Sequence, residues 1–192
     1  MKPYLQLLAP YIAVLICWNI FQNAWAAIAL YHLQILFWAV HAPRKKLFGG
    51  FNLKYLVFAV PAAAAGPALY LLLPFITRTE LSEWLSAYGL AGPGLAAMIP
   101  YFGIIHPLLE QMHWSRLREQ TALAHPLFAG YHLLVLASLL TLPWLSVCFI
   151  ILLTASVCWQ YFTRKTGNLL LPVFSHILAD LSLILAAWLI VC

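Results

Sequence analysis

Residues 3–43, PYLQLLAPYIAVLICWNIFQNAWAAIALYHLQILFWAVHAP, contain no Asp, Glu, Lys or Arg. A helix of about 20 residues crosses the hydrocarbon core of a bilayer, so this stretch is too long for one membrane span and long enough for two. We expect spans at 4–20 and 24–42, joined by a tight turn within residues 19–23. The stretch therefore predicts a polytopic, all-α transmembrane bundle.

The composition of the whole chain agrees with this class. Of 192 residues, 65% are hydrophobic and 8% are charged, and the mean hydropathy is +0.92, whereas an ordinary soluble domain has roughly a quarter charged residues. A soluble monomer is excluded. The net charge of +5 comes from basic residues between the apolar stretches, where they orient a membrane protein, so no nucleic-acid partner is implied. The cysteines form no CxxC pair, which indicates neither a disulfide framework nor a zinc ribbon.

The rest of the chain predicts five further spans, and a total of seven. Six or eight are the alternatives if residues 81–88 lie at the interface or re-enter the membrane, and residues 78–84 are expected to form a loop. We treat residues 1–192 as a single integral membrane domain, in which 1–88 hold the first three spans and an outer loop and 89–192 hold a motif-bearing core. The five further spans are expected at 56–77, 89–115, 124–141, 143–162 and 168–191.

The basic residues gather on one side of this topology. With the N-terminus inside, only Arg78 faces the outside, which is a strong positive-inside bias. The N-terminal segment lacks a small-residue cleavage site, so we interpret it as the first span and not as a removable signal. We expect a cytoplasmic N-terminus in a bacterial plasma (inner) membrane. The basic residues on the inner side are Lys2, Arg44, Lys45, Lys46, Lys54, Arg116, Arg118, Arg164 and Lys165.

Of the ionisable residues inside the predicted spans, four matter most: Glu110, His132, His176 and Asp180. Each costs on the order of 2.5–3.5 kcal/mol in hydrocarbon, so a helix that keeps one is either near an interface or uses it. At 1.5 Å per residue, Glu110, His132 and His176 lie roughly 9–12 Å from the inner edge. Asp180 follows His176 by one helical turn, on the same face. Three helices can thus bring two carboxyls and two imidazoles to one pocket that faces the cytoplasm.

A simpler interpretation is that these are isolated polar contacts that hold helices together, as in many membrane bundles. His32, His113 and His125 are weaker candidates for the pocket, because each can reach an interface or a backbone carbonyl. His106 is a better candidate, since it lies one turn before Glu110 on the same helical face.

The chemistry that this set of side chains supports is hydrolysis by an activated water molecule. A carboxylate in a low-dielectric site is a competent general base, and imidazoles can stabilise an oxyanion or protonate a leaving amine. A serine nucleophile fits less well, because no GxSxG motif occurs. The same side chains could ligate zinc, but the chain has no HExxH motif. We expect neither a metal nor another cofactor.

Three motifs around these residues resemble those of the CPBP family of intramembrane endopeptidases, which includes the CAAX prenyl endopeptidases. The first, HPLLEQMHWSR at residues 106–116, is similar to the family's EExxxR segment. The second, FAGYH at 128–132, matches FxxxH, and the third, HILAD at 176–180, matches HxxxN or HxxxD. The motifs stand in the family's order over residues 90–190, while the first three spans match only as generic hydrophobic helices.

The resemblance implies a role for each of the four buried ionisable residues. Glu110 takes the place of the family's water-activating glutamate, and Asp180 that of its asparagine. His132 and His176 take the places of the catalytic or oxyanion-supporting histidines. Further residues expected to line or support the pocket are His106, Gln111, Trp114, Arg116 and Phe128.

Two positions depart from the first family motif. Gln111 stands where the second Glu is expected, and Ser115 stands where the Arg is expected, with Arg116 one position later. The usual ion pair is therefore absent at both ends, which leaves no orphan charge.

The resulting expectation is a metal-independent intramembrane endopeptidase of the glutamic type. Its expected partners are membrane lipids and a peptide or protein substrate, with or without a lipid group. Two alternatives stay open: a catalytically inactive CPBP-like binding or scaffold protein, and a small-solute transporter. A transporter needs a polar route through the outer half of the membrane, and that half of the fourth, fifth and seventh spans is nearly free of ionisable residues.

Overall fold

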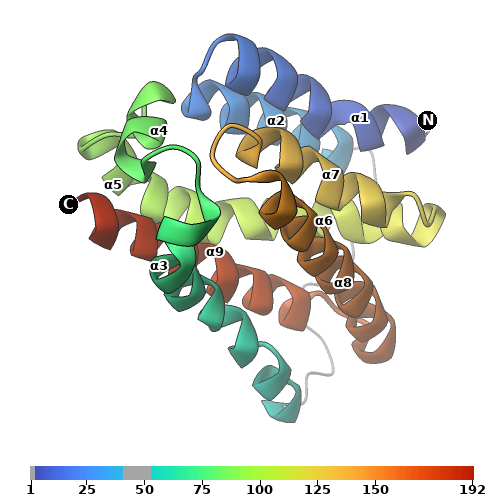
Figure 1. Cartoon of the computed structure of the whole chain (residues 1–192). Helices are drawn as coiled ribbons and strands as arrows, with labels where there is room; N and C mark the ends of the chain where they lie inside the picture. The colour runs from blue at the N-terminus through green and yellow to red at the C-terminus, as the bar shows by residue number, and fades with distance from the viewer. Residues whose placement is uncertain (1–2, 41–52) are drawn as a thin grey trace.

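The computed structural model describes residues 3–40 and 53–192, which form helices joined by short connections (Figure 1). Within these residues the only extended pairing is an isolated bridge between Thr77 and Leu140. The predicted all-α class is confirmed. The α-helices are α1 (Pro3–Ala13), α2 (Ala24–Val40), α3 (Ala65–Ile76), α4 (Leu81–Ala87), α5 (Pro93–Pro100), α6 (His106–Gln120), α7 (Ala124–Leu136), α8 (Leu142–Thr166) and α9 (Leu170–Val191).

Segments with 3₁₀ or π geometry extend several of these helices. The π-helical segment Val14–Ile20 continues α1, and Tyr101–Ile105 joins α5 to α6 without a break. Two 3₁₀ segments, Leu53–Phe58 and Val60–Ala64, precede α3. Helical structure therefore runs through most of each predicted span.

Within residues 3–40 and 53–192, three helical stretches are long and apolar enough to cross a membrane, and three more are apolar but shorter. The chain is therefore compatible with a membrane protein. The count of seven spans and the cytoplasmic N-terminus stay predictions, and Lys2, Arg44, Lys45 and Lys46, on which the orientation partly rests, lie outside the described residues. The long stretches are Lys54–Ile76, Leu142–Thr166 and Leu170–Val191, and the shorter ones are Tyr4–Ile20, Ala24–Ala39 and Ala124–Leu136.

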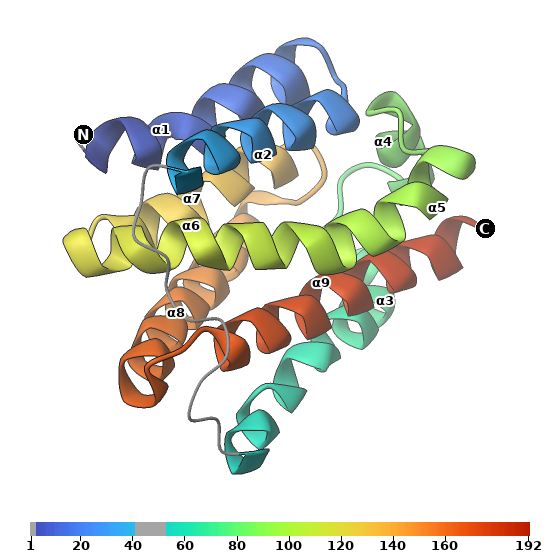
Figure 2. The ribbon, with the colours of Figure 1, turned by 180° about the vertical axis from the view of Figure 1, so that it is seen from behind.

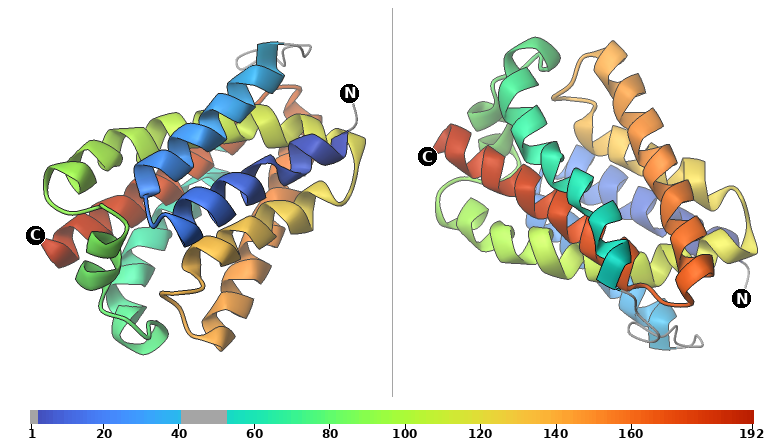
Figure 3. Two further views of the ribbon diagram at one scale, coloured as in Figure 1. Left: turned by 90° about the horizontal axis from the view of Figure 1, so that it is seen from above. Right: turned by 90° about the horizontal axis from the view of Figure 1, so that it is seen from below.

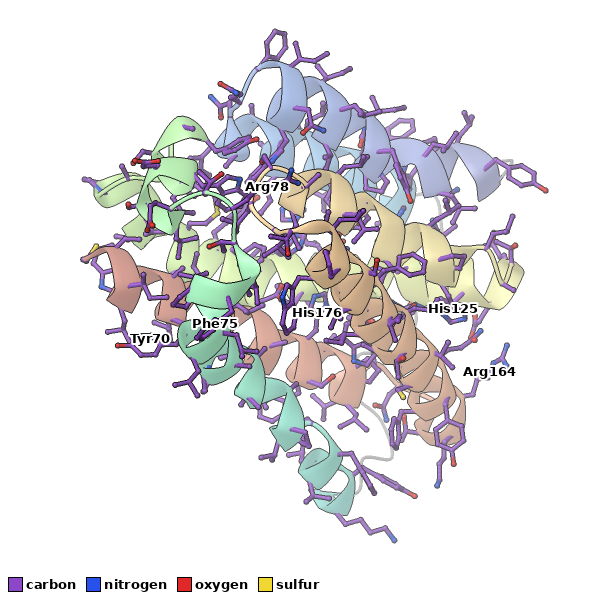
Figure 4. All side chains as sticks on the ribbon, viewed as in Figure 1. Tyr70, Phe75, Arg78, His125, Arg164 and His176 are labelled. Carbon is purple, nitrogen blue, oxygen red and sulfur yellow. The ribbon has the colours of Figure 1, made fainter. Side chains whose placement is uncertain are left out.

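Arg78 and Arg164 lie at opposite ends of α8 (Figure 4). The Arg78 guanidinium donates to the carbonyl of Ala137, shortly before α8 begins. Arg164 belongs to the last turn of α8. The predicted topology requires this separation between the outer arginine and the inner basic cluster.

A helix replaces part of the loop expected at residues 78–84, so that expectation was wrong from Leu81 onward. The segment carries two glutamates, which favoured a solvated loop, but its apolar residues are spaced three and four apart and lie on one helical face. The Nε1 of Trp84 donates to Ser138 Oγ at 2.9 Å, in the connection between α7 and α8. The buried apolar residues of α4 are Leu81, Trp84 and Leu85.

Helix α6 occupies the middle of the bundle. It contacts α1, α2, α7, α8 and α9. Figure 2 shows it between the α1–α2 pair and α9, and from above α2 crosses over it (Figure 3, left). Nine of its 15 residues are buried, including the charged side chains of Glu110 and Arg118. Polar groups on such a helix must find their partners inside the protein.

Two glycines allow neighbouring segments to approach α9 closely. A Cβ atom at Gly66 would lie 2.1 Å from the backbone oxygen of Ser182, and one at Gly103 would lie 3.1 Å from the Cα of Leu181. The Gly66 amide also donates to Ser182 Oγ at 3.0 Å. Small residues serve this purpose in membrane helix packing, and α3 accordingly lies along α9 (Figure 3, right).

Candidate active site

Glu110 lies at the centre of the polar cluster and has no exposed surface. Its Oε1 accepts hydrogen bonds from two tyrosine hydroxyls, Tyr31 of α2 at 2.6 Å and Tyr131 of α7. Trp114 Nε1 donates to the Tyr31 hydroxyl at 2.7 Å, which leaves the Tyr31 proton for the carboxylate. One oxygen of Glu110 is thus held by groups from two other helices, and the second oxygen is left for other contacts.

The second oxygen of Glu110 faces two histidines and, beyond them, Asp180. Oε2 lies 3.5 Å from His106 Nε2 and 3.8 Å from His176 Nε2. His176 Nε2 lies 3.3 Å from Asp180 Oδ2. In the described part of the chain, Glu110 Oε2 and Asp180 Oδ2 are buried and have no hydrogen-bond partner.

Buried carboxylate oxygens without a partner are destabilising and uncommon. Here they share a small volume with two imidazole nitrogens from α6 and α9, near the centre of the molecule, where Figure 4 labels His176. Polar atoms that converge in this way can together bind a water molecule or a reacting carbonyl group.

A chain of donors determines which nitrogen of His176 carries the proton. Arg118 can only donate, and its Nη1 donates to Gln111 Oε1 at 3.1 Å. The Gln111 amide nitrogen therefore faces His176 Nδ1, also at 3.1 Å, and donates to it. Since Nδ1 acts as an acceptor, the neutral ring carries its proton on Nε2, the nitrogen that faces both carboxylates.

Arg118 places a buried cation beside Gln111. It reaches Gln111 because the two residues are seven positions apart, about two turns along one face of α6. Its side chain is 2% exposed, and the guanidinium lies 5.6 Å from the ring centroid of Phe128 and 5.4 Å from that of Trp159. Aromatic faces stabilise such a cation.

Phe128 and Trp114 form the aromatic wall of the site, and both are fully buried. Their ring centroids lie 5.5 Å apart in an edge-to-face arrangement. Phe128 also contacts His132 and His176, at 4.9 and 6.3 Å between centroids. The wall restricts the rotation of both imidazoles and excludes water from their apolar sides.

The position of His132 differs from that of the other predicted site residues. Its Nδ1 donates to the carbonyl of Phe128, one turn earlier, at 2.8 Å. Its ring lies 4.0 Å from that of Tyr131 and interacts electrostatically with Glu110 and Asp180. Among the described residues it makes no hydrogen bond to either carboxylate. His132 therefore lies beside the polar cluster and is not hydrogen-bonded to it.

Arg116 is the one predicted site residue whose side chain bonds to groups outside the polar cluster. Its guanidinium donates to the side chain of Gln6 and to the carbonyl of Trp38, on the side of α6 that faces α1 and α2. Arg118, which the sequence analysis counted only for orientation, takes the contact with Gln111.

Three residues that hold the site were missed in the sequence: Tyr31, Tyr131 and Arg118. The spacing of seven between Gln111 and Arg118 is a signal that could have found the last of them. Tyr131 lies inside the second motif, next to His132. For Tyr31 the sequence carries no comparable signal, because its partners are on other helices.

No group of three or more His, Cys, Asp or Glu side chains in residues 3–40 and 53–192 has an arrangement that could hold a metal ion. The expected metal-free site remains a prediction for elemental analysis.

Comparison with protein-family models, with curated proteins and with solved structures finds no match to this chain. The resemblance to the CPBP family therefore rests on the three motifs and stays a prediction.

Proposed function

We propose that this chain is a membrane-embedded endopeptidase of the CPBP type, in which Glu110 activates water for attack on a peptide bond. The observation that carries the proposal is the pair of buried, unpartnered oxygens, Glu110 Oε2 and Asp180 Oδ2, beside His176 Nε2. Water bound there touches a base and an N–H donor at once, as hydrolysis requires.

In the proposed reaction, Glu110 Oε2 takes a proton from water while the water oxygen bonds to the carbonyl carbon of the peptide. The carbonyl oxygen becomes an oxyanion, which accepts a hydrogen bond from His176 Nε2–H. Glu110 then returns the proton to the peptide nitrogen, and the C–N bond breaks. The products are a carboxylic acid and an amine, and Glu110 is restored as a carboxylate.

The surroundings proposed for this reaction are those of a lipid bilayer. Large apolar side chains are exposed along α8, with Ile150 and Ile151 each 61% exposed. Apolar patches of this kind indicate a membrane or a partner surface. We assign the basic end of α6 to the cytoplasm of a bacterial cell, by the positive-inside argument. Because Glu110 has no exposed surface, a substrate reaches it only when the surrounding helices part.

The decisive experiment compares wild-type protein with Glu110→Gln in lipid nanodiscs, using a peptide library with and without C-terminal prenyl groups. Glu110→Gln keeps the shape of the side chain but cannot accept the proton, so cleavage should fall about 100-fold or more. His113→Gln is the matched control, because His113 is buried on the same helix but its hydrogen bond goes to the Gln6 carbonyl and not to Glu110 or His176. Retained turnover in Glu110→Gln would contradict the proposal, and peptide binding without cleavage in the wild type would favour the inactive binding protein.

A further inference from the structure

A second chain of polar groups leads away from Glu110 toward the start of its helix. His106 Nε2 lies 3.5 Å from Glu110 Oε2, and His106 Nδ1 lies 3.0 Å from Nε2 of His32 on α2. His32 Nδ1 lies 2.8 Å from the hydroxyl of Tyr101. Both nitrogens of His32 and Nδ1 of His106 are therefore hydrogen-bonded, and His106 Nε2 faces Glu110 Oε2 across a gap that a small side-chain shift or one bridging water would close. A role in holding helices together needs only one nitrogen from each ring.

The two histidines are buried and the far end of the chain is not. His32 is 3% exposed and His106 is 6% exposed, while Tyr101 is half-buried. The rings of His32 and His106 are stacked, with centroids 5.2 Å apart and an interplanar angle of 27°. The chain thus connects a carboxylate without exposed surface to the hydroxyl of a half-buried tyrosine.

Three other side chains around Glu110 do not carry a proton outward. Tyr31 accepts from Trp114, an indole that only donates. His176 Nδ1 is occupied by the amide of Gln111, and an amide neither accepts nor releases protons as an acid or base. His132 Nδ1 donates to a backbone carbonyl, which ends that branch.

Imidazole, by contrast, accepts a proton at one nitrogen and releases one at the other. We propose that His106, His32 and Tyr101 form a proton relay that connects the buried carboxylate of Glu110 with the hydroxyl of the half-buried Tyr101. The relay lies outside the proposed catalytic set and does not depend on peptide cleavage.

The transfer balances step by step. Glu110 releases its proton to His106 Nε2, and His106 passes the proton on its Nδ1 to His32 Nε2. His32 passes the proton on its Nδ1 to the Tyr101 oxygen, which releases its own proton to water. One proton has left Glu110, each ring has changed from the Nδ1–H to the Nε2–H tautomer, and the reverse sequence reloads the carboxylate.

The relay runs along the helix axis, away from Arg116 and Arg118. Tyr101 precedes Glu110 by nine residues, which is about 13 Å of helix. The proton therefore leaves toward the end of the bundle opposite the basic end of α6.

The test is a rapid pH jump on protein in lipid nanodiscs, followed by time-resolved infrared spectroscopy of the Glu110 carboxyl band. The band is assigned by its loss in Glu110→Gln. His32→Gln keeps a polar side chain that cannot relay a proton, and Tyr101→Phe removes only the terminal hydroxyl. Both should slow the protonation of Glu110 about tenfold or more. Imidazole added to His32→Ala should restore the rate.

His113→Gln is again the matched control, since it removes a buried imidazole of α6 that has no contact with the relay. Wild-type rates in His32→Gln and Tyr101→Phe, or an equal slowing in the control, would overturn the relay. Should His32→Gln not fold, Tyr101→Phe decides alone. Because the carboxyl band is followed without any peptide, slowed protonation in a protein that cleaves nothing would refute the proposed function and leave the relay intact.

Discussion

Replacement of Gln111 by Glu tests whether the side chain at this position decides the protonation of His176. A carboxylate keeps the shape of the amide but has no N–H, so it cannot donate to His176 Nδ1 as Gln111 does at 3.1 Å. One of its oxygens would pair with Arg118, which now donates to the amide oxygen at 3.1 Å. The other oxygen would face Nδ1 as an acceptor. Nδ1 of His176 is therefore expected to gain a proton in Gln111→Glu.

The magnitude follows from the hydrogen bonds that are exchanged. In the wild type, a proton on Nδ1 would forfeit the bond from the amide, about 1 kcal/mol net for a neutral pair. In Gln111→Glu, the same proton would gain a charge-assisted bond of about 2 kcal/mol. The preference at Nδ1 thus changes by about 3 kcal/mol, which is roughly a hundredfold change in the ratio of protonated to unprotonated Nδ1.

Nitrogen-15 NMR of histidine-labelled protein measures this directly, because protonated and unprotonated ring nitrogens resonate apart, and a His176→Gln spectrum assigns the signals. Gln111→Leu is the control: it removes both bonds and offers Nδ1 no acceptor, so His176 should keep its proton on Nε2, which still faces Glu110 and Asp180. It should also reduce the free energy of unfolding by about 1.5–3 kcal/mol, because the buried Arg118 loses its acceptor. A proton on Nδ1 in the wild type, or none there in Gln111→Glu, would refute the reasoning.

Three further predictions address the packing of α3 on α9, the hydrogen bonds to Glu110 Oε1 and the expected absence of zinc. Gly66→Val should lower the free energy of unfolding by about 1–3 kcal/mol in a detergent melt, because its Cβ meets the backbone of Ser182; an unchanged melting temperature would mean that α3 does not pack there. Tyr31→Phe should lower the free energy of unfolding by about 1–2 kcal/mol, since Glu110 loses a hydrogen-bond donor. Tyr70→Phe, on the exposed surface, should leave it unchanged. Equal losses in the two variants would contradict the role of the Tyr31 hydroxyl. Elemental analysis should find no stoichiometric zinc, and a chelator should leave cleavage unchanged; zinc at one per chain, with activity lost to the chelator and restored by the metal, would make the site's imidazoles and carboxylates ligands.

The sequence alone was sufficient for the fold class. Long uncharged runs are a local property of the chain, and in a bilayer they have few solutions other than helices. The all-α class and the compatibility with a membrane follow from them. Local spacing also places His176 and Asp180 on one face of α9, because residues four apart in a helix are neighbours whatever surrounds them. The same spacing is present at α4, in Leu81, Trp84 and Leu85, but the two glutamates were given more weight and a loop was expected there.

The arrangement of the site depended on tertiary packing. The spacing of seven within α6 puts Arg118 on the face of Gln111, whereas the partners of Arg116 on α1 and α2 come from tertiary packing. Tyr31 is 79 positions from Glu110 and enters the site only because α2 packs on α6. Helical periodicity defines which residues share a face, but which face meets which neighbour depends on the shapes of side chains distant in sequence. For this reason the motifs located the carboxylates and imidazoles, and only the folded bundle showed which groups hold them.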